Sequence, residues 1–157
     1  MSDTQAEICF SGKFPLKVDA KRRVSIPAFY LGQVQSKIFQ IARGPDHNLF
    51  VYPMEVFMKI ASKINENYGS RGEKDREKRL YFNETMGDAQ PVQCDQQGRI
   101  TVPPEFLKYA NITNKVLIIG GYTKLIFWNP DDYEKFISSG EMTSQERVGE
   151  FGWVEGE

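Results

Sequence analysis

The stretch Pro15-Leu-Lys-Val-Asp19-Ala-Lys-Arg-Arg23-Val-Ser-Ile-Pro27-Ala-Phe-Tyr-Leu31 occurs twice in this chain. Shifted by 76 residues, it aligns with Pro91-Val-Gln-Cys-Asp95-Gln-Gln-Gly-Arg99-Ile-Thr-Val-Pro103-Pro-Glu-Phe-Leu107. The same shift places Gly44 on Gly120, Leu49-Phe-Val-Tyr52 on Leu125-Ile-Phe-Trp128, and Phe57 on Tyr133. Agreement without a gap over about forty residues indicates one supersecondary unit used twice.

Each copy of this unit predicts short strands and one small helix. Val24-Ser-Ile26 and Ile100-Thr-Val102 alternate apolar and polar residues, which is typical of half-buried strands. The proline after each strand stops the ladder and opens a short helix. Further strands are expected at 37–42, 49–52, 115–120 and 125–128, with turns at 44–46 and 120–121. A helix follows the second hairpin, with Asn129 as its N-cap and Pro130 at its first position.

A helical segment separates the two copies. Apolar residues from Val56 to Ile64 fall on one helical face, and Tyr68-Gly-Ser-Arg-Gly72 is expected to end that helix. A second, highly charged helix is expected from Glu73 to Phe82, and a solvated surface explains its charges better than a binding patch.

These patterns predict an α+β, β-rich fold built from two internal repeats. The expected organisation is an N-terminal extension at 1–9, repeat 1 at 10–60, a helical spacer at 61–88, repeat 2 at 89–137 and an acidic C-terminal tail at 138–157. Phe151 and Trp153 in the tail are candidates for contacts with a neighbouring subunit.

Composition narrows the classes of function. No apolar run is long enough to span a membrane, and residues 1–7 do not have the pattern of a secretory signal, so we expect a cytoplasmic protein. Cys9, Cys94 and His47 are too few for a Cys/His zinc site; we expect both thiols to pack as small apolar groups and the histidine to lie on the surface. No nucleophile elbow, P-loop or dinucleotide-binding motif is present, so we expect no enzyme, no cofactor and no metal, although a carboxylate pair stays open.

The repeated motif, the segment Phe10-Ser-Gly-Lys-Phe14 and the ending Leu125-Ile-Phe-Trp-Asn-Pro130 together resemble the MraZ family. The resemblance covers about residues 10 to 137. It implies two SpoVT/AbrB-like swapped-hairpin halves folded as one pseudo-twofold β-barrel with flanking helices. It also implies a ring-shaped homo-oligomer, associated with the nucleoid, that regulates transcription. The expected partner is double-stranded DNA, at short repeated promoter boxes upstream of the division and cell-wall gene cluster.

The Asp-x-x-x-Arg motifs are the signature of that family, and the resemblance implies that they face DNA. Carried over, they are Asp19, Lys21 and Arg23 in the first repeat, and Asp95 and Arg99 in the second. An arginine oriented by an aspartate can read guanine O6 and N7, and clustered cations contact phosphates. The DNA-binding candidates are Lys21, Arg22, Arg23, Gln97 and Arg99, with Asp19 and Asp95 as orienting residues.

Other interpretations of the motifs stay open. Asp19 and Arg23 could form an ion pair that only holds a turn. The chain could also be an antitoxin-like module that binds a protein partner, or an enzyme or ligand-binding barrel. Arg22 also departs from the family, which has glycine at this position, as Gly98 does in the second repeat. If the turn needs a positive φ, either the first loop has a different shape or the extra cation compensates for a strain of about 1 kcal/mol.

Overall fold

The computed structural model describes residues 7–72 and 75–152. It is an α+β protein with two antiparallel sheets, as the sequence predicts at this level. In chain order the elements are β1 (Lys13–Lys17), β2 (Arg23–Ser25), α1 (Ala28–Leu31), β3 (Ile38–Arg43), β4 (Leu49–Pro53), α2 (Met54–Gly72), α3 (Arg76–Asp88), β5 (Gln90–Gln93), β6 (Arg99–Thr101), α4 (Pro104–Tyr109), β7 (Lys115–Gly121), β8 (Lys124–Trp128), α5 (Pro130–Ser138) and α6 (Ser144–Phe151).

The strand order reflects the sequence repeat. The larger sheet has the order β1-β7-β8-β4-β3-β5, and β2 pairs with β6 in a separate two-stranded ladder. In each sheet one central pair joins residues that are 76 positions apart: Phe50 with Ile126, and Val24 with Ile100. A pseudo-twofold axis therefore passes through both pairs and relates the two repeats within one chain.

The first strand of each repeat pairs with the other repeat. Strand β1 lies against β7, and β5 lies against β3. Neither β1 nor β5 was predicted, because Pro15 and Pro91 lie inside them and proline lowers the expectation of a strand. Both strands are edges of the sheet, where a missing N–H is tolerated. Within the described residues the sheet is open between these two edges, so the expected barrel closure is not observed.

Tyr30 from α1 lies at the centre of the core and is fully buried. Its hydroxyl donates a hydrogen bond of 2.6 Å to the carbonyl of Ser11, and its ring packs edge-on against Phe10 and Phe14 at centroid distances of 5.0 and 5.2 Å. Burial raises the pKa of Tyr30, so the hydroxyl remains a donor. The first helix thereby holds the N-terminal segment and β1 in place.

The N-terminal segment also lies unusually close to the end of β7. The amide of Gly120 donates to the carbonyl of Gly12 at 2.9 Å, and the amide of Phe10 donates to the carbonyl of Tyr122 at 2.7 Å. A Cβ atom at Gly120 would overlap the backbone of Ser11. Glycine is required at this position because two backbones meet there.

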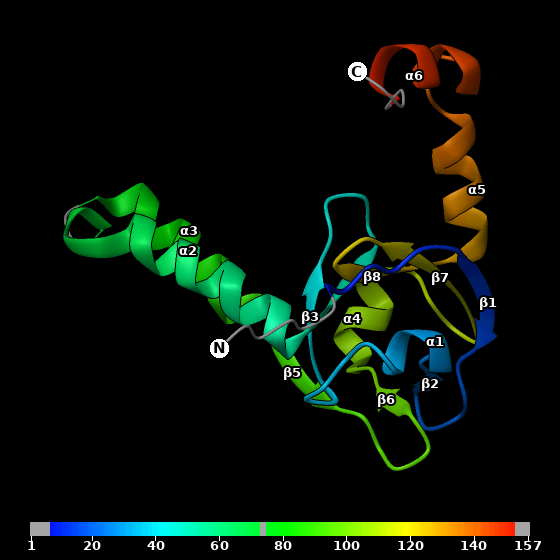
Figure 1. Cartoon of the computed structure of the whole chain (residues 1–157), viewed down its shortest axis with the longest axis horizontal. Helices are drawn as coiled ribbons and strands as arrows, with labels where there is room; N and C mark the ends of the chain where they lie inside the picture. Colours follow the sequence, from blue (N-terminus) through cyan, green and yellow to red (C-terminus); the bar gives the residue numbers. More distant parts are fainter. Residues whose placement is uncertain (1–6, 73–74, 153–157) are drawn as a thin grey trace.

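Helices α2 and α3 form a hairpin that projects from the sheets (Figure 1). Helix α2 ends at Gly72, the last residue of the segment that was expected to end it, and so continues through Gly69. A glycine costs a helix only about 1 kcal/mol, and packing between the helices offsets this: the rings of Tyr68 and Phe82 lie 4.6 Å apart. Helix α3 begins at Arg76, later than expected, because the side chain of Asp75 caps the amides of Glu77 and Lys78.

The base of this hairpin is fixed to the second repeat through Arg43. The guanidinium of Arg43 forms an ion pair with Asp88 at the end of α3. The same group lies over the ring of Phe106, at 4.8 Å from its centroid, and over the ring of Tyr109 at 5.5 Å. The guanidinium of Arg43, on β3, therefore contacts both α3 and α4.

The C-terminal region is more ordered than the composition suggests. The expected tail contains α6, which begins after Thr143, whose hydroxyl accepts a hydrogen bond from the amide of Glu146. Phe151 is 74% exposed, and Trp153 lies outside the described residues. None of the described helices is long and apolar enough to cross a membrane.

The two cysteines differ from each other. Cys94 is buried as expected, and burial raises the pKa of its thiol to about 11. Cys9 is exposed, so the expectation that it packs as an apolar group is wrong. His47 is exposed, as predicted, and the centroid of its ring lies 5.0 Å from that of Tyr109, with the two ring planes tilted by 32°.

Candidate nucleic-acid interface

The two Asp-x-x-x-Arg segments form equivalent tight loops, one between β1 and β2 and one between β5 and β6. In the first loop the amide of Asp19 donates to the carbonyl of Arg23 at 3.1 Å, and the amide of Arg22 donates back to the carbonyl of Asp19 at 3.0 Å. In the second loop the matching bonds of Asp95, Gly98 and Arg99 measure 2.8 and 3.0 Å. The backbones of the two loops are therefore closed in the same way.

The aspartate side chain organises each loop from inside. One carboxylate oxygen of Asp19 accepts hydrogen bonds from the amides of Lys21 at 2.9 Å and Arg23 at 2.8 Å. One oxygen of Asp95 accepts from the amides of Gln97 and Arg99, both at 2.9 Å. The carboxylate replaces a backbone turn partner, as aspartate does in Asx turns.

The other carboxylate oxygen holds the arginine. Oδ2 of Asp19 accepts from Nε of Arg23 at 2.6 Å, and Oδ2 of Asp95 accepts from Nε of Arg99 at 2.8 Å. Within the described residues the two terminal nitrogens of each guanidinium form no hydrogen bond with the protein. Each arginine is therefore held at Nε and presents its two terminal nitrogens, Nη1 and Nη2, which can donate hydrogen bonds to two neighbouring acceptors.

These hydrogen bonds keep both carboxyl groups ionised. The hydrogen bond from the amide of Arg23 is the largest cause that holds the pKa of Asp19 below the ordinary value of 3.8; desolvation opposes it, and the side chain of Arg23 and the amide of Lys21 lower the pKa further. Arg99 and Gln97 lower the pKa of Asp95 in the same way. Because the folded-state pKa lies below the unfolded one, the stabilisation is present at neutral pH and is lost only as the pH falls through the acid range.

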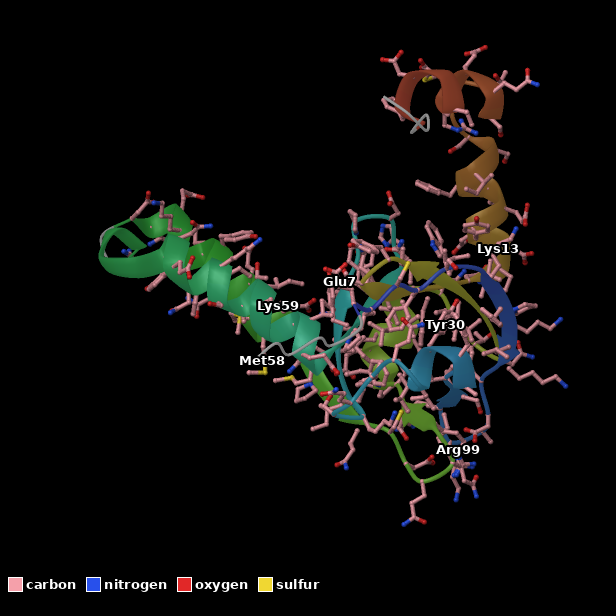
Figure 2. The ribbon with its side chains drawn as sticks, viewed as in Figure 1. Glu7, Lys13, Tyr30, Met58, Lys59 and Arg99 are labelled. Atoms are coloured by element: carbon pink, nitrogen blue, oxygen red, sulfur yellow. The ribbon has the colours of Figure 1, made fainter. Side chains whose placement is uncertain are left out.

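Pairing of β2 with β6 brings the two arginines onto one face. Arg23 lies opposite Thr101, and Ser25 lies opposite Arg99, so these four side chains share the outer face of the ladder. Val24 and Ile100, on the other face, are fully buried. Diagonal neighbours of this kind are ~7–8 Å apart. Figure 1 shows both loops at one end of the molecule, and Figure 2 shows Arg99 there, far from Lys59 on the hairpin.

Ser25 and Thr101 were missed as candidate contact residues. The alternation in Val24-Ser-Ile26 and Ile100-Thr-Val102 predicts strands, but by itself it does not mark these hydroxyl residues as contact residues. The same period places Ser25 and Thr101 on the face opposite the core, together with the arginines. Lys21, Arg22 and Gln97 are exposed at the loops, so the structure brings all the predicted contact residues to the same end.

Arg22 takes the conformation that favours glycine. Its φ is 61°, and the matching Gly98 has a φ of 78°. The first loop therefore keeps the shape of the second. Arg22 therefore does not give the first loop a different shape. The first loop instead carries the backbone strain of a non-glycine residue at positive φ.

Replacing Arg22 with glycine should therefore stabilise the fold. We expect Arg22→Gly to raise the free energy of unfolding by about 1 kcal/mol, because the left-handed conformation costs a non-glycine residue about this much. Gly98→Ala is the matched control and should destabilise, since a Cβ there would lie 2.6 Å from Cδ1 of Leu31. Urea denaturation of both variants measures this. A destabilised Arg22→Gly would show that the arginine side chain contributes more than its backbone strain costs.

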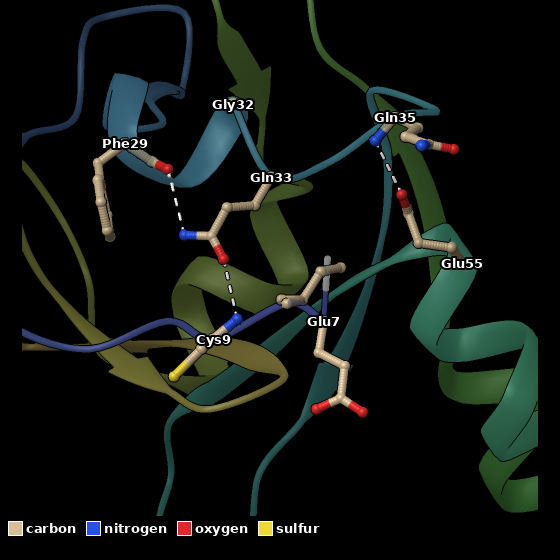
Figure 3. Close-up of a pocket in the computed structure, with 8 residues that line it drawn as sticks. Glu7, Cys9, Phe29, Gly32, Gln33, Gln35 and Glu55 are labelled. Carbon is tan, nitrogen blue, oxygen red and sulfur yellow. Dashed lines mark hydrogen bonds between the residues drawn. The ribbon is translucent and has the colours of Figure 1, made fainter. Parts of the chain in front are cut away.

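Two other kinds of site, a metal centre and a ligand cavity, have less support among the described residues. Among the described residues no three Cys, His, Asp or Glu side chains are grouped to hold a metal ion. A cavity of about 470 Å³ lies between the N-terminal segment, α1 and the start of α2 (Figure 3). There Gln33 accepts from the amide of Cys9 at 2.8 Å, and Glu55 accepts from the amide of Gln35 at 2.8 Å. None of the predicted site residues lines this cavity.

Comparison with known proteins identifies the family. The family model described as "MraZ protein, putative antitoxin-like" matches residues 9–80 and 85–149. The protein named transcriptional regulator MraZ from Acetivibrio thermocellus is 31% identical over 141 residues, covering 90% of this chain and 94% of its own length. The proteins of the same name from Halothermothrix orenii and Herpetosiphon aurantiacus are 30% and 32% identical, covering 87% and 83% of this chain and 92% and 87% of their own lengths.

These matches confirm the resemblance stated from the repeated motifs. They extend over both repeats and the helical hairpin. They also confirm that the chain is not an enzyme, because this is a family of transcriptional regulators. The chain belongs to the MraZ family.

Proposed function

We propose that this protein regulates transcription by binding double-stranded promoter DNA through the face formed by the two Asp-x-x-x-Arg loops. One observation carries the proposal: Arg23 and Arg99 are each held at Nε by an aspartate and present two donor nitrogens on one exposed face. Two parallel donors match O6 and N7 of guanine in the major groove.

The residues of the face divide into two roles. Arg23 and Arg99 read bases. Lys21 and Arg22 contact phosphates, which fixes position but carries no sequence information. Gln97 supplies a neutral hydrogen-bonding group in the second loop. Ser25 and Thr101 add hydroxyl groups between the arginines.

The role of Lys21 predicts a sequence-independent effect. Lys21→Ala should weaken binding to specific and to random DNA by the same factor. Loss of one phosphate contact should also reduce the slope of log K against log salt concentration by about 0.9 for each engaged subunit. Fluorescence anisotropy across a salt series measures both quantities. If Lys21→Ala weakens only the specific complex, Lys21 contacts bases and the division of roles is wrong.

The proposed regulator acts as a closed ring. One chain has a net charge of −1 and offers only two small loops, so tight binding requires several copies on the same DNA. Apolar side chains available for subunit contacts include Phe29, Tyr122, Val148 and Phe151, which are 62–74% exposed. Light scattering at micromolar concentration should give a single species of several subunits. A stable monomer under these conditions would contradict the ring.

The finer features implied by the family belong to the same proposal. The exchange of first strands between the repeats supports two swapped-hairpin halves, although the described sheet does not close as a barrel. We propose the repeats at 10–60 and 89–137 as the two halves, the segment 61–88 as a spacer between them, and 1–9 and 138–157 as extensions. The binding site is a set of short repeated boxes upstream of the division and cell-wall gene cluster. The protein then works in the cytoplasm, on the nucleoid.

A further inference from the structure

Two lysines lie opposite each other at one end of the β1–β7 ladder, outside the Asp-x-x-x-Arg loops. In the antiparallel pairing of β1 with β7, Lys17 is the direct partner of Lys115, and both residues are exposed. Residues paired in this way have Cβ atoms about 4.5–5.5 Å apart, and like charges so placed repel each other. Within the described residues neither lysine forms an ion pair. The pair is therefore an unbalanced concentration of positive charge on the surface.

The equivalent end of the β3–β5 ladder is neutral. There Gln93, which aligns with Lys17 after the shift of 76 residues, lies opposite Ile38. The carboxylate nearest to Lys17 along the chain is that of Asp19, and it already accepts hydrogen bonds from the amides of its own loop and from Nε of Arg23. Facing lysines are thus not a requirement of this position in the repeat, and the nearest carboxylate does not balance them.

The lysine pair shares the face of the motif arginines. Val18 is buried, so Lys17 and Asp19 on either side of it point outward together. The chain stays extended through this segment, since the amide of Val18 still donates to the carbonyl of Asn114 at 3.0 Å. Lys17 is therefore about 7 Å of extended chain from Asp19, the residue that holds Arg23.

We propose that Lys17 and Lys115 together bind one backbone phosphate of the DNA. This rests on the proposed DNA-binding function and extends the contact surface from the loops onto the larger sheet. Arginines that read bases lie within a major groove about 12 Å wide, and the phosphates that border the groove are left to cations beside the loops. Two facing lysines, each a point charge on a flexible stem, can place both ammonium groups on the same phosphate. The phosphate then balances the repulsion between them.

Lys17→Gln/Lys115→Gln, the lysine-pair variant, removes both charges and places at position 17 the residue found at the equivalent Gln93. Lys59→Gln/Lys63→Gln is the matched control. These two lysines are also exposed and are four residues apart on α2, in the hairpin, where Figure 2 shows Lys59 far from the loops. Both variants lose two positive charges per subunit. Neither should lower the midpoint of thermal unfolding, because like-charged neighbours repel each other.

Fluorescence anisotropy measures the affinity for a duplex with one copy of a sequence enriched from a random pool, and for a random duplex. The lysine-pair variant should bind both duplexes more weakly by the same factor, because a phosphate contact carries no sequence information. Its slope of log K against log salt concentration should be shallower by about 0.9, for one phosphate lost. A fourfold rise in salt should therefore cost it about 3.5-fold less affinity than it costs the unaltered protein. The hairpin control should keep the slope of the unaltered protein.

Neutral methylphosphonates, placed one at a time along each strand of the enriched duplex, locate the contact. Neutralising the phosphate held by the pair should weaken binding of the unaltered protein and of the hairpin control. It should not weaken binding of the lysine-pair variant further, since both changes remove the same interaction. If every phosphate that matters to the unaltered protein matters equally to the lysine-pair variant, or if the salt slope is unchanged, the inference is overturned while DNA binding stands. If the unaltered protein enriches no sequence and binds no duplex, the proposed function itself fails.

Discussion

Replacing both Arg23 and Arg99 with alanine should remove most of the preference of this protein for its specific site. Each guanidinium that donates to guanine through two nitrogens contributes about 1–3 kcal/mol of discrimination. The double variant should therefore lose at least roughly 30-fold in the ratio of specific to random affinity. Affinity for random DNA should fall as well, because two cations per subunit are lost.

Two controls separate this effect from a general loss of charge or of structure. Lys59→Ala removes an exposed cation on the hairpin, far from the loops in Figure 2, and should leave the ratio unchanged. Circular dichroism and light scattering of the double variant should match those of the unaltered protein. If the double variant is folded and assembled but keeps its affinity ratio, the arginines hold turns and do not read bases.

Replacing Tyr30 with alanine should have the largest effect on stability. The side chain is fully buried, packs against Phe10 and Phe14 and donates a hydrogen bond to Ser11. Truncation of a buried aromatic side chain typically costs about 3–5 kcal/mol, a large share of the ~5–15 kcal/mol that holds a domain together. Urea denaturation followed by tryptophan fluorescence should show the transition at a much lower concentration.

Tyr30→Phe isolates the hydrogen bond from the packing. It keeps the ring and removes only the donor to Ser11, so we expect a loss of about 1–2 kcal/mol. An equally large loss in both variants would assign the stability to the hydroxyl. A small loss in Tyr30→Ala would mean that the N-terminal segment is held mainly by its backbone bonds to Gly120 and Tyr122.

The sequence predicts the pseudo-twofold symmetry of the fold because the two halves have similar sequences. The shift of 76 residues that aligns Asp19 with Asp95 also relates the paired residues Val24 and Ile100. The candidate site follows from the same alignment, since in each repeat it places an aspartate four residues before an arginine, close enough to orient it. The structure adds that Nε is the nitrogen that is held, which spacing alone cannot specify.

Other features depend on packing that no local pattern records. Strands β1 and β5 contain Pro15 and Pro91 and are strands because they complete edges next to distant partners. Helix α2 continues through Gly69 because α3 packs along it. The positive φ of Arg22 runs against local preference and was recognised only through its match to Gly98. In each case a tertiary contact or the second repeat outweighs local propensity.

The most direct test keeps the charge of the interface and changes only its shape. Arg23→Lys/Arg99→Lys retains two cations on the same face but replaces each planar fork with a point charge. Fluorescence anisotropy titrations give the ratio of specific to random affinity across a salt series. They use a DNA duplex carrying a sequence that the unaltered protein enriches from a random pool, and a duplex of random sequence. We predict that affinity for random DNA and the salt slope stay the same, while the ratio falls at least tenfold, or about 1.4 kcal/mol. A ratio equal to that of the unaltered protein would contradict base reading by the two held arginines.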